Sequence, residues 1–373
     1  MRLLDRYLLR ELLIPLGYCL GGFLVFWISF DLIGELDDFQ SNSLKPLEIA
    51  EYYLVKTPEL LSVVLPVALL LALLYALTNH ARHHELIAIR GAGVSLWRLS
   101  TPYLGVGLGL SLALFGLNEV VLPDSNDRAE AILHRREIGQ ANSGASPFPQ
   151  NVHILNARDN RTWSITNFNL VTSEMQGVTV DWQLPNRSSQ VIIAERARWT
   201  LGAWHFQNAQ ILFHSGRSSL DDYQSRTNLL IVRNFTETPN EIKSEIKINS
   251  LSSLTAAKRV RLSLREIWDY QRLHPALRAD RKALLDTQYH GRLAGPWTCL
   301  VVVLIALPFG AASGRRNVFV GVASSILICF IYFVLLKFGL ALGTSGRLPG
   351  WLAAWSPNLA FIGAGIWLTL RVR

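Results

Sequence analysis

Six long apolar stretches constrain this chain more than any other feature, with three in its first third and three in its last quarter. About 20 apolar residues in a helix cross the roughly 30 Å hydrocarbon core of a bilayer, and each stretch is long enough. The stretches are Leu12–Ile33, Leu60–Asn79, Leu99–Asn118, Leu293–Gly314, Asn317–Gly346 and Leu348–Leu370. Inside them only Asp31 and Lys337 carry a charge. We therefore predict six transmembrane helices.

The length of the stretches distinguishes them from buried helices and from a signal peptide. Buried helices of a soluble protein are rarely this long without a charge. The first stretch exceeds the apolar core of a cleaved signal peptide and lacks a small-x-small cleavage site before the acidic residues that follow it. It is therefore kept as the first transmembrane helix.

Basic residues in the short connections predict the orientation of the helices. If six helices alternate, the chain start, the connections between helices two and three and between four and five, and the chain end share one side. Their basic residues include Arg2, Arg6, Arg10, Arg82, Arg90, Arg98, Arg315, Arg316, Arg371 and Arg373. The connection between helices one and two is mostly acidic. Both termini are therefore predicted to be cytoplasmic, and the large central segment periplasmic.

Composition excludes other classes of protein. The net charge is +8 and the isoelectric point is near 9.6, but the basic residues are divided between membrane flanks and the central segment. The sequence has no basic recognition helix and no zinc-finger spacing, so we predict no nucleic-acid binding. The three cysteines, Cys19, Cys299 and Cys329, all lie in apolar stretches. The central segment must therefore fold without a disulfide.

The central segment changes from helical periodicity to the two-residue alternation of strands. Val178 with Val180 and Trp204 with Phe206 are examples of apolar residues that alternate with polar ones between turn signals. Short strands at this spacing predict an antiparallel sandwich or open, jelly-roll-like fold. Whether its apolar inner face is filled by its own side chains or is open to a lipid is left undecided by the sequence.

Two helical segments are predicted to connect the sheet to the membrane helices. Residues 126–137 continue the third helix, and residues 263–289 form a charged connector with Ser263 and Glu266 spaced as a capping box. The predicted fold is an α+β membrane protein in three parts. They are residues 1–122 with helices one to three, residues 123–291 with the periplasmic β-rich domain and its connector helix, and residues 292–373 with helices four to six.

Motifs of known chemistry are absent from the sequence. It contains no G-x-x-x-x-G-K-S/T loop for ATP, no G-x-S-x-G nucleophile elbow and no H-E-x-x-H pair. His80, His83 and His84 are interpreted as a solvated flank at a helix end, because no cysteine accompanies them. We predict no catalytic residue, no metal site and no cofactor bound by this chain.

The connection between helices two and three is the most informative short segment. Residues 84–90 are predicted to form a short helix, and Thr101 with Pro102 the start of helix three. Glu85 is the one acid in a connection otherwise rich in Arg and His, and it is either a solvated charge or a contact for a basic partner. A short helix at the inner membrane face has the shape through which a transporter receives force from a separate ATPase.

Five motifs occur in order along both membrane halves. They are Asp31-Leu-Ile-Gly-Glu-Leu-Asp-Asp-Phe39, Glu85-Leu-Ile-Ala-Ile-Arg-Gly-Ala-Gly93, Asn118-Glu-Val-Val-Leu-Pro123, His290-Gly-Arg-Leu-Ala-Gly-Pro296, and Leu307-Pro-Phe-Gly310 followed by Gly314-Arg-Arg316. Together they resemble the YjgP/YjgQ permease family, the lipopolysaccharide-export permeases of Gram-negative bacteria.

The resemblance implies a fold and a set of partners. Members of the family have six membrane helices and a periplasmic jelly-roll domain, and two permeases pair as a homo- or heterodimer around a lipid-holding cavity in the inner membrane. A cytoplasmic ATPase dimer uses ATP and Mg, and a single-span periplasmic bridge protein receives the lipopolysaccharide. The family's coupling helix corresponds to about 84–94, which makes Glu85, Arg90, Gly91 and Gly93 candidates for ATPase coupling.

Lipopolysaccharide contacts are predicted from its chemistry, because its phosphates attract Arg and Lys and its acyl chains need an apolar cavity. Arg128, Arg135 and Arg136, just beyond helix three, are candidates, with solvated charges on an exposed helix as the alternative. Lys337 in helix five either faces a cavity or partner, or extends its ammonium group to the membrane surface.

The outer end of helix one departs from the family. Some members carry basic residues there, whereas this chain has Asp31, Glu35, Asp37 and Asp38. Three possibilities follow: the paired permease supplies the positive charge, divalent cations bridge the acids to the lipid, or the transported lipid differs.

The leading hypothesis is a non-catalytic permease subunit of an ATP-driven exporter that extracts lipopolysaccharide and passes it to a periplasmic bridge. An ion-gradient-driven secondary transporter is an alternative, but it needs ionisable residues near the bilayer midplane, and Asp31 and Lys337 lie away from it. A membrane-anchored periplasmic sensor or scaffold is another, although six helices exceed what anchoring requires.

Overall fold

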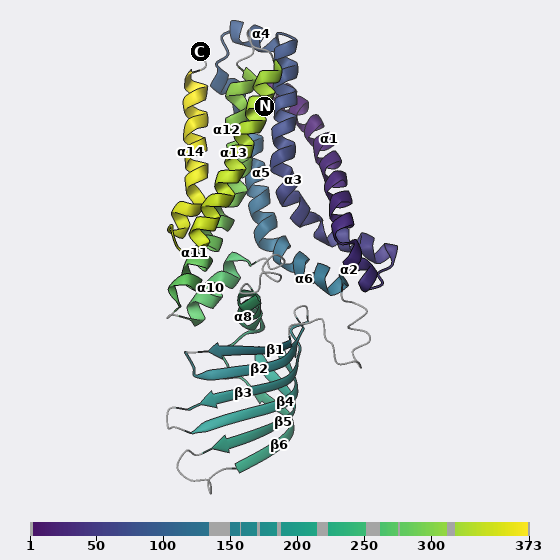
Figure 1. Ribbon diagram of the computed structural model, residues 1–373, viewed down its shortest axis with the longest axis vertical. Helices are drawn as coiled ribbons and strands as arrows, with labels where there is room; N and C mark the ends of the chain where they lie inside the picture. Colours follow the sequence, from purple (N-terminus) through teal and green to yellow (C-terminus); the bar gives the residue numbers. More distant parts are fainter. Residues whose placement is uncertain are drawn as a thin grey trace. The chain divides into compact units, whose positions relative to one another are not determined.

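The computed structural model describes residues 3–133, 150–156, 158–169, 172–184, 188–214, 223–250, 262–274, 277–311 and 318–371 (Figure 1). The chain divides into two compact units. The helical unit comprises Met1–Leu36, Lys56–Leu122 and Arg278–Arg373, and the sheet unit comprises Asp37–Val55 and Pro123–Leu277. Residues 279–291, which the sequence boundaries place with the periplasmic domain, belong to the helical unit.

Long apolar helices build the helical unit, as the sequence predicts. Its elements are α1 (Leu3–Gly34), α3 (Pro46–Arg82), α4 (Glu85–Gly91), α5 (Leu96–Gly116), the π-helical turn η1 (Leu117–Val121), α11 (Ala279–Ala294), the 3-10 turn η3 (Gly295–Trp297), α12 (Thr298–Ala311), α13 (Val318–Thr344) and α14 (Gly350–Arg371). In the described part of the chain, five helical segments are long and apolar enough to cross a membrane: Leu3–Gly34, Pro46–Arg82, Trp97–Val121, Ala279–Pro308 and Ile326–Thr344. The sixth predicted span, α14, has 22 residues but is not among these five.

Helix α5 begins earlier than predicted. Ser95 is its N-cap, and the Ser95 hydroxyl oxygen accepts a hydrogen bond from the Arg98 backbone N–H at 3.3 Å. Thr101 instead donates its hydroxyl hydrogen to the carbonyl oxygen of Trp97 at 3.0 Å. The predicted start at Thr101 and Pro102 is therefore wrong, because Ser95 supplies the cap more than one turn earlier.

Small residues let the helices of this unit approach one another closely, which is common in membrane helix bundles. A Cβ atom at Gly339 of α13 would lie 2.6 Å from the carbonyl oxygen of Ala353 in α14. A Cβ atom at Gly350 would lie 2.7 Å from the carbonyl carbon of Asp286 in α11. Helices α11, α13 and α14 therefore pack at backbone distance, with no room for larger residues at these contacts.

A buried polar network crosses the break between α11 and α12. Pro296 in η3 has no N–H, and Asn358 of α14 donates its side-chain amide to the carbonyl oxygen of Ala294 at 2.8 Å. The Tyr332 hydroxyl in turn donates to the Asn358 amide oxygen at 2.6 Å. The network satisfies a carbonyl that the bilayer interior cannot hydrate.

The sheet unit contains a six-stranded antiparallel sheet with the order β1-β2-β3-β4-β5-β6 (Figure 1). The strands are β1 (Gln150–Asn156), β2 (Arg161–Phe168), β3 (Met175–Gln183), β4 (Ser189–Thr200), β5 (Ala203–His214) and β6 (Tyr223–Val232), and the described helices are α2 (Leu36–Ser41), α6 (Leu122–Leu133), α8 (Pro239–Ser250) and α10 (Leu264–Leu273). The α+β fold with an inserted antiparallel sheet is confirmed. Its described strands follow one another as a meander, so they lack the crossovers that define a jelly roll.

In several strands the alternation of buried and exposed residues shifts by one position, so that two buried residues are three positions apart instead of two. This shift keeps the same face of the sheet buried along the whole strand. In β3, Met175 and Val178 are both buried although they are three positions apart, and Gly177 between them has a φ of +61°. The same shift separates Ile165 from Phe168 in β2, Ala194 from Ala197 in β4 and Phe206 from Ala209 in β5. Because the shifts occur in neighbouring strands, one apolar face continues across the sheet.

The segment after β6, residues 233–238, crosses this buried face and is called the strap. Its Phe235 is 4% exposed and contacts the rings of Trp163 and Phe206. Helix α8 follows the strap and adds Ile242 and Ile246 to the same core cluster. Residues of this chain therefore fill the apolar face beneath the strap.

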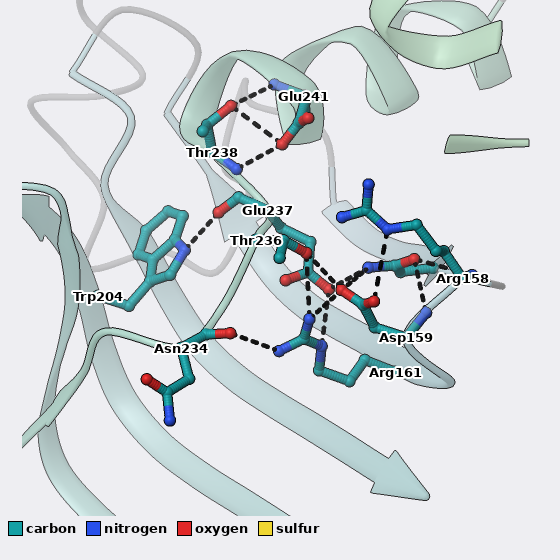
Figure 2. Close-up of polar contacts among 10 residues, drawn as sticks. Arg158, Asp159, Arg161, Trp204, Asn234, Thr236, Glu237, Thr238 and Glu241 are labelled. Carbon is teal, nitrogen blue, oxygen red and sulfur yellow. Dashed lines mark hydrogen bonds and ion pairs between the residues drawn. The ribbon is translucent and has the colours of Figure 1, made fainter. Parts of the chain in front are cut away.

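A buried polar cluster fastens the strap to the β1–β2 turn (Figure 2). Arg161 and Glu237 are each 2% exposed and form an ion pair at 3.1 Å. The Arg161 guanidinium also donates to Asp159 and to the Thr236 hydroxyl. Asn156 donates its side-chain amide to Glu237 at 2.7 Å. The Arg161 charge is thus shared among groups of the turn and the strap, which offsets the cost of burying it.

Candidate functional site

The short helix predicted between helices two and three is present as α4 (Glu85–Gly91). His84 precedes it with a φ of +59°, and Gly93 follows it with a φ of +83°, so a left-handed residue flanks each end. Leu86 is 5% exposed and anchors the helix to the core. The prediction of a short helix that ends in a glycine-rich turn is confirmed.

Glu85 is turned toward its own chain and held by two other helices. The Tyr7 hydroxyl of α1 donates to the carboxylate at 2.9 Å to Oε2 and 3.1 Å to Oε1. His80 Nδ1 of α3 lies 2.7 Å from Glu85 Oε2 and acts as the donor, since a carboxylate can only accept. The Glu85 side chain keeps 33% of its surface exposed. This carboxylate therefore joins α1, α3 and α4 while remaining accessible to a partner.

The surroundings of Glu85 keep it ionised. Partial burial alone would raise its pKa, but the hydrogen bonds from His80 and Tyr7, together with favourable electrostatics from His80 and His83, outweigh burial and lower the pKa of Glu85 below its ordinary 4.5. Glu85 therefore carries its negative charge throughout the neutral pH range.

Other residues of α4 face outward. Ile87 is 59% exposed, and Arg90 and Gly91 are also exposed. The helix therefore presents an apolar side chain and a cation next to the partly exposed Glu85 carboxylate.

A second polar contact joins α1 to the end of the same connection. Arg98, in the first turn of α5, forms an ion pair with Asp5 of α1 at 2.8 Å, with 35% and 15% of their side chains exposed. Asp5 and Tyr7 are two residues apart, so the start of α1 contacts both ends of the segment from Glu85 to Arg98.

The sequence analysis missed Tyr7, His80, Asp5 and Arg98. It interpreted His80 as part of a solvated flank, which is wrong, because its side chain is 0% exposed. His83 and His84 are exposed as expected. Tyr7 lies 78 residues from Glu85, and Asp5 lies 93 residues from Arg98, so local spacing could not reveal these two contacts, whereas His80 is only five residues from Glu85. Among the described residues, no group of His, Cys, Asp and Glu is arranged to hold a metal ion.

The predicted lipid-contact residues do not gather in one described site. Arg128 belongs to α6 in the sheet unit, and Lys337 is exposed on α13 in the helical unit. Arg135 and Arg136 lie outside the described residues. The role of each of these residues in binding lipopolysaccharide remains a prediction.

The acids at the C-terminal end of α1 have a cationic partner in the same chain. Lys56 of α3 lies 2.8 Å from Asp31 and 3.4 Å from Glu35, and its side chain is 13% exposed. The structure thus adds an intramolecular partner to the three possibilities that the sequence left open for these acids.

Long apolar helices with an inserted antiparallel sheet define the class of this protein as a helical membrane protein of α+β architecture. The model of the lipopolysaccharide export system permease LptF/LptG family matches residues 6–371, and the chain belongs to this family. It is thus a transmembrane permease of the lipopolysaccharide-export ABC system, whose ATPase is the separate protein LptB. No curated protein matches the sequence.

Proposed function

We propose that α4 is the coupling helix on which LptB docks. One observation carries the proposal: α4 is fixed to the bundle by Leu86 and Glu85 while Ile87 and Arg90 remain accessible. Glu85 contributes an oriented anion on the same short helix as the Arg90 cation. Gly91 and Gly93 end the helix so that the chain can turn into α5.

The orientation follows from the basic residues. The start of α1, the α4 connection and the chain end carry the arginines, so these segments face the cytoplasm and the sheet unit faces the periplasm of a cell with two membranes. LptB then docks on the side that carries α4. A periplasmic bridge protein receives the lipid on the opposite side.

Apolar surface on the helical unit supports pairing with a second permease around the lipid. In the most apolar 18-residue stretch of α1, α5 or α13, only 17% is buried within this chain. The corresponding share for α3 is 61%. Membrane lipid, lipopolysaccharide acyl chains and the second permease all offer apolar contacts to these helices. Arg128, Arg135, Arg136 and Lys337 are the proposed contacts for lipopolysaccharide phosphates.

LptB recovery tests the docking proposal. Arg90→Glu reverses the accessible charge of α4, and we expect about tenfold less LptB to copurify with the permease in detergent, because interface centres tolerate charge reversal poorly. Arg226→Glu changes an arginine of β6, in the sheet unit, and is the matched control. Equal LptB recovery with wild-type protein and Arg90→Glu contradicts docking on this face of α4.

A further inference from the structure

The start of α1 is tied to the docking segment by polar side chains. Tyr7 reaches Glu85 at the beginning of the segment, and Asp5 reaches Arg98 at its end. The hydrogen bonds from Tyr7 to Glu85 and from Arg98 to Asp5 are each 2.9 Å long, and bonds to charged groups are stronger than neutral ones. Tyr7 thus couples the start of α1 to α4, and Asp5 couples it to the start of α5, so a displacement of the segment from Glu85 to Arg98 that preserves both contacts must carry the start of α1 with it.

Helix α1 also packs on the bundle core, tightly in its first half and through partly buried residues such as Cys19, Leu20 and Phe23 further along. Its buried residues are Leu8, Leu12 and Leu16, all in its first half and spaced to form one stripe. In the second half, Val25 is 67% and Phe30 is 70% exposed. By contrast, most of the apolar stretch of α3 is buried, and it includes the fully buried Leu69, Leu73 and Leu77.

The middle of α1 is also the place where the helix bends most easily. Pro15 lies inside the helix and removes one backbone hydrogen bond. Gly17, Gly21 and Gly22 follow, and an added Cβ atom at any of them would meet no atom within 4 Å. Close packing within this chain therefore does not require these glycines, and each lowers helix stability.

The C-terminal end of α1 is fixed to a different helix. Lys56 of α3 bridges Asp31 and Glu35, so the helix is held by polar contacts near both ends. A displacement imposed at Tyr7 and Asp5 therefore has to be absorbed between these attachments, where Pro15 and the glycines lie.

We propose that Tyr7 and Asp5 are positioning residues that deliver an LptB-driven displacement of the segment from Glu85 to Arg98 to α1, which bends between Pro15 and Gly22 during lipid transport. The inference rests on the proposed docking of LptB on α4 and adds the side chains that carry the force.

The test uses the complete complex of this permease, its partner permease and LptB in proteoliposomes that contain lipopolysaccharide. Tyr7→Phe removes only a hydroxyl group, and Asp5→Asn removes only a charge. For the double variant we expect LptB recovery and ATP hydrolysis close to wild type, with about tenfold less lipopolysaccharide transferred to the bridge protein per ATP, since hydrogen bonds to charged groups are lost. Tyr18→Phe, at an exposed tyrosine of the same helix, is the control.

A distance measurement separates transmission from a general loss of structure. Spin labels at Val25→Cys in α1 and Phe330→Cys in α13, in a protein without the native cysteines, should change separation on ATP binding in wild type and not in the double variant. Asp5→Arg combined with Arg98→Asp should restore transfer that either change alone reduces.

Two results overturn the inference. One is wild-type transfer per ATP and a wild-type spin-label response in the double variant. The other is loss of LptB from the double variant, which would assign Tyr7 and Asp5 to docking instead of transmission. Failure of the proposed function is a different result, because then LptB recovery is insensitive to Arg90→Glu while the Tyr7 and Asp5 variants bind LptB normally.

Discussion

Two carboxylates illustrate how neighbours decide what an acidic residue does. Glu85 accepts hydrogen bonds from Tyr7 and His80 in the helical unit, whereas Asp159 accepts them from Thr236 and Arg161 in the sheet unit. Both carboxylates have lowered pKa values and stay ionised at neutral pH. Glu85 retains access to a partner on the proposed docking helix, while Asp159 joins a turn to the strap, so we assign a functional role to the first and a structural role to the second.

The pKa of Asp159 predicts how the stability of the sheet unit depends on pH. Burial alone would raise this pKa, but hydrogen bonds from Thr236 and Arg158 and the charge of Arg161 lower it from 3.8 to about 2. A lowered pKa in the folded state stabilises the fold above the unfolded value, and this contribution is lost as pH falls from about 4 to about 2.

We expect Asp159→Asn to lower the free energy of unfolding of the sheet unit by roughly 2 kcal/mol at pH 7 and by much less near pH 2. Tryptophan fluorescence of the sheet during denaturation provides the measurement. Glu174→Gln is the control, because its ion pair with Arg198 is largely exposed and contributes less than about 1 kcal/mol. A loss for Asp159→Asn that is the same at every pH contradicts the assignment.

The contacts of single residues could be predicted from the sequence only in part. The acid Glu85 could be singled out from its basic surroundings, but Tyr7 and His80 could not be assigned to it. The Tyr7 contact joins residues 78 apart and forms only when α1 packs beside α4, whereas His80 is five residues from Glu85 and meets it because the chain turns between α3 and α4. His80 was misinterpreted because burial at a helix end depends on what covers it.

At the scale of elements, the sheet depends on positions where the strand alternation shifts. Gly177 has a φ of +61°, and an added Cβ atom would lie 2.5 Å from the Thr166 hydroxyl oxygen in the neighbouring strand. Gly202 in the β4–β5 turn has a φ of +76°, but an added Cβ atom there meets nothing within 4 Å. A side chain at Gly202 would therefore cause backbone strain alone, whereas one at Gly177 would cause both backbone strain and a steric clash.

Alanine substitutions at these positions should differ in cost. Gly202→Ala should destabilise the sheet unit by about 1 kcal/mol through left-handed backbone strain. Gly177→Ala adds a clash and should cost about 2–4 kcal/mol. Thermal unfolding followed by tryptophan fluorescence ranks the variants, and a Gly202→Ala protein at least as unstable as Gly177→Ala contradicts this account of the shifted strands.

Element types followed from periodicity, whereas their connections did not. Uncharged runs and two-residue alternation predicted long helices and antiparallel strands, because burial in lipid or in one sheet face imposes those patterns. The order of the strands and the position of the strap depend on contacts between residues far apart in the sequence. The start of α5 depends on which of two candidate residues, Ser95 or Thr101, caps the helix. Strand spacing predicted a sandwich or an open jelly roll, and the family resemblance implied a jelly roll, whereas the described strands form one sheet in sequential order.

At the scale of the whole molecule, the two units meet different solvents. The helical unit exposes large apolar residues such as Phe26, Phe30 and Phe338, which a bilayer covers and water does not. The sheet unit encloses Trp163, Trp204 and Phe206 at 0% exposure and contains no cysteine. Such a unit folds by burying its own apolar face, which suits a domain exported across a membrane.

The central claim is that LptB acts on α4 at one side of the inner membrane while the sheet unit handles lipid at the other. Cysteine labelling with a membrane-impermeant maleimide tests it most directly, using Leu201→Cys in the 99% exposed β4–β5 turn and Arg90→Cys on α4. In cells whose outer membrane is opened and inner membrane intact, the account predicts labelling at position 201 and none at position 90 until the inner membrane is disrupted. Protection of position 201 until that disruption would contradict it.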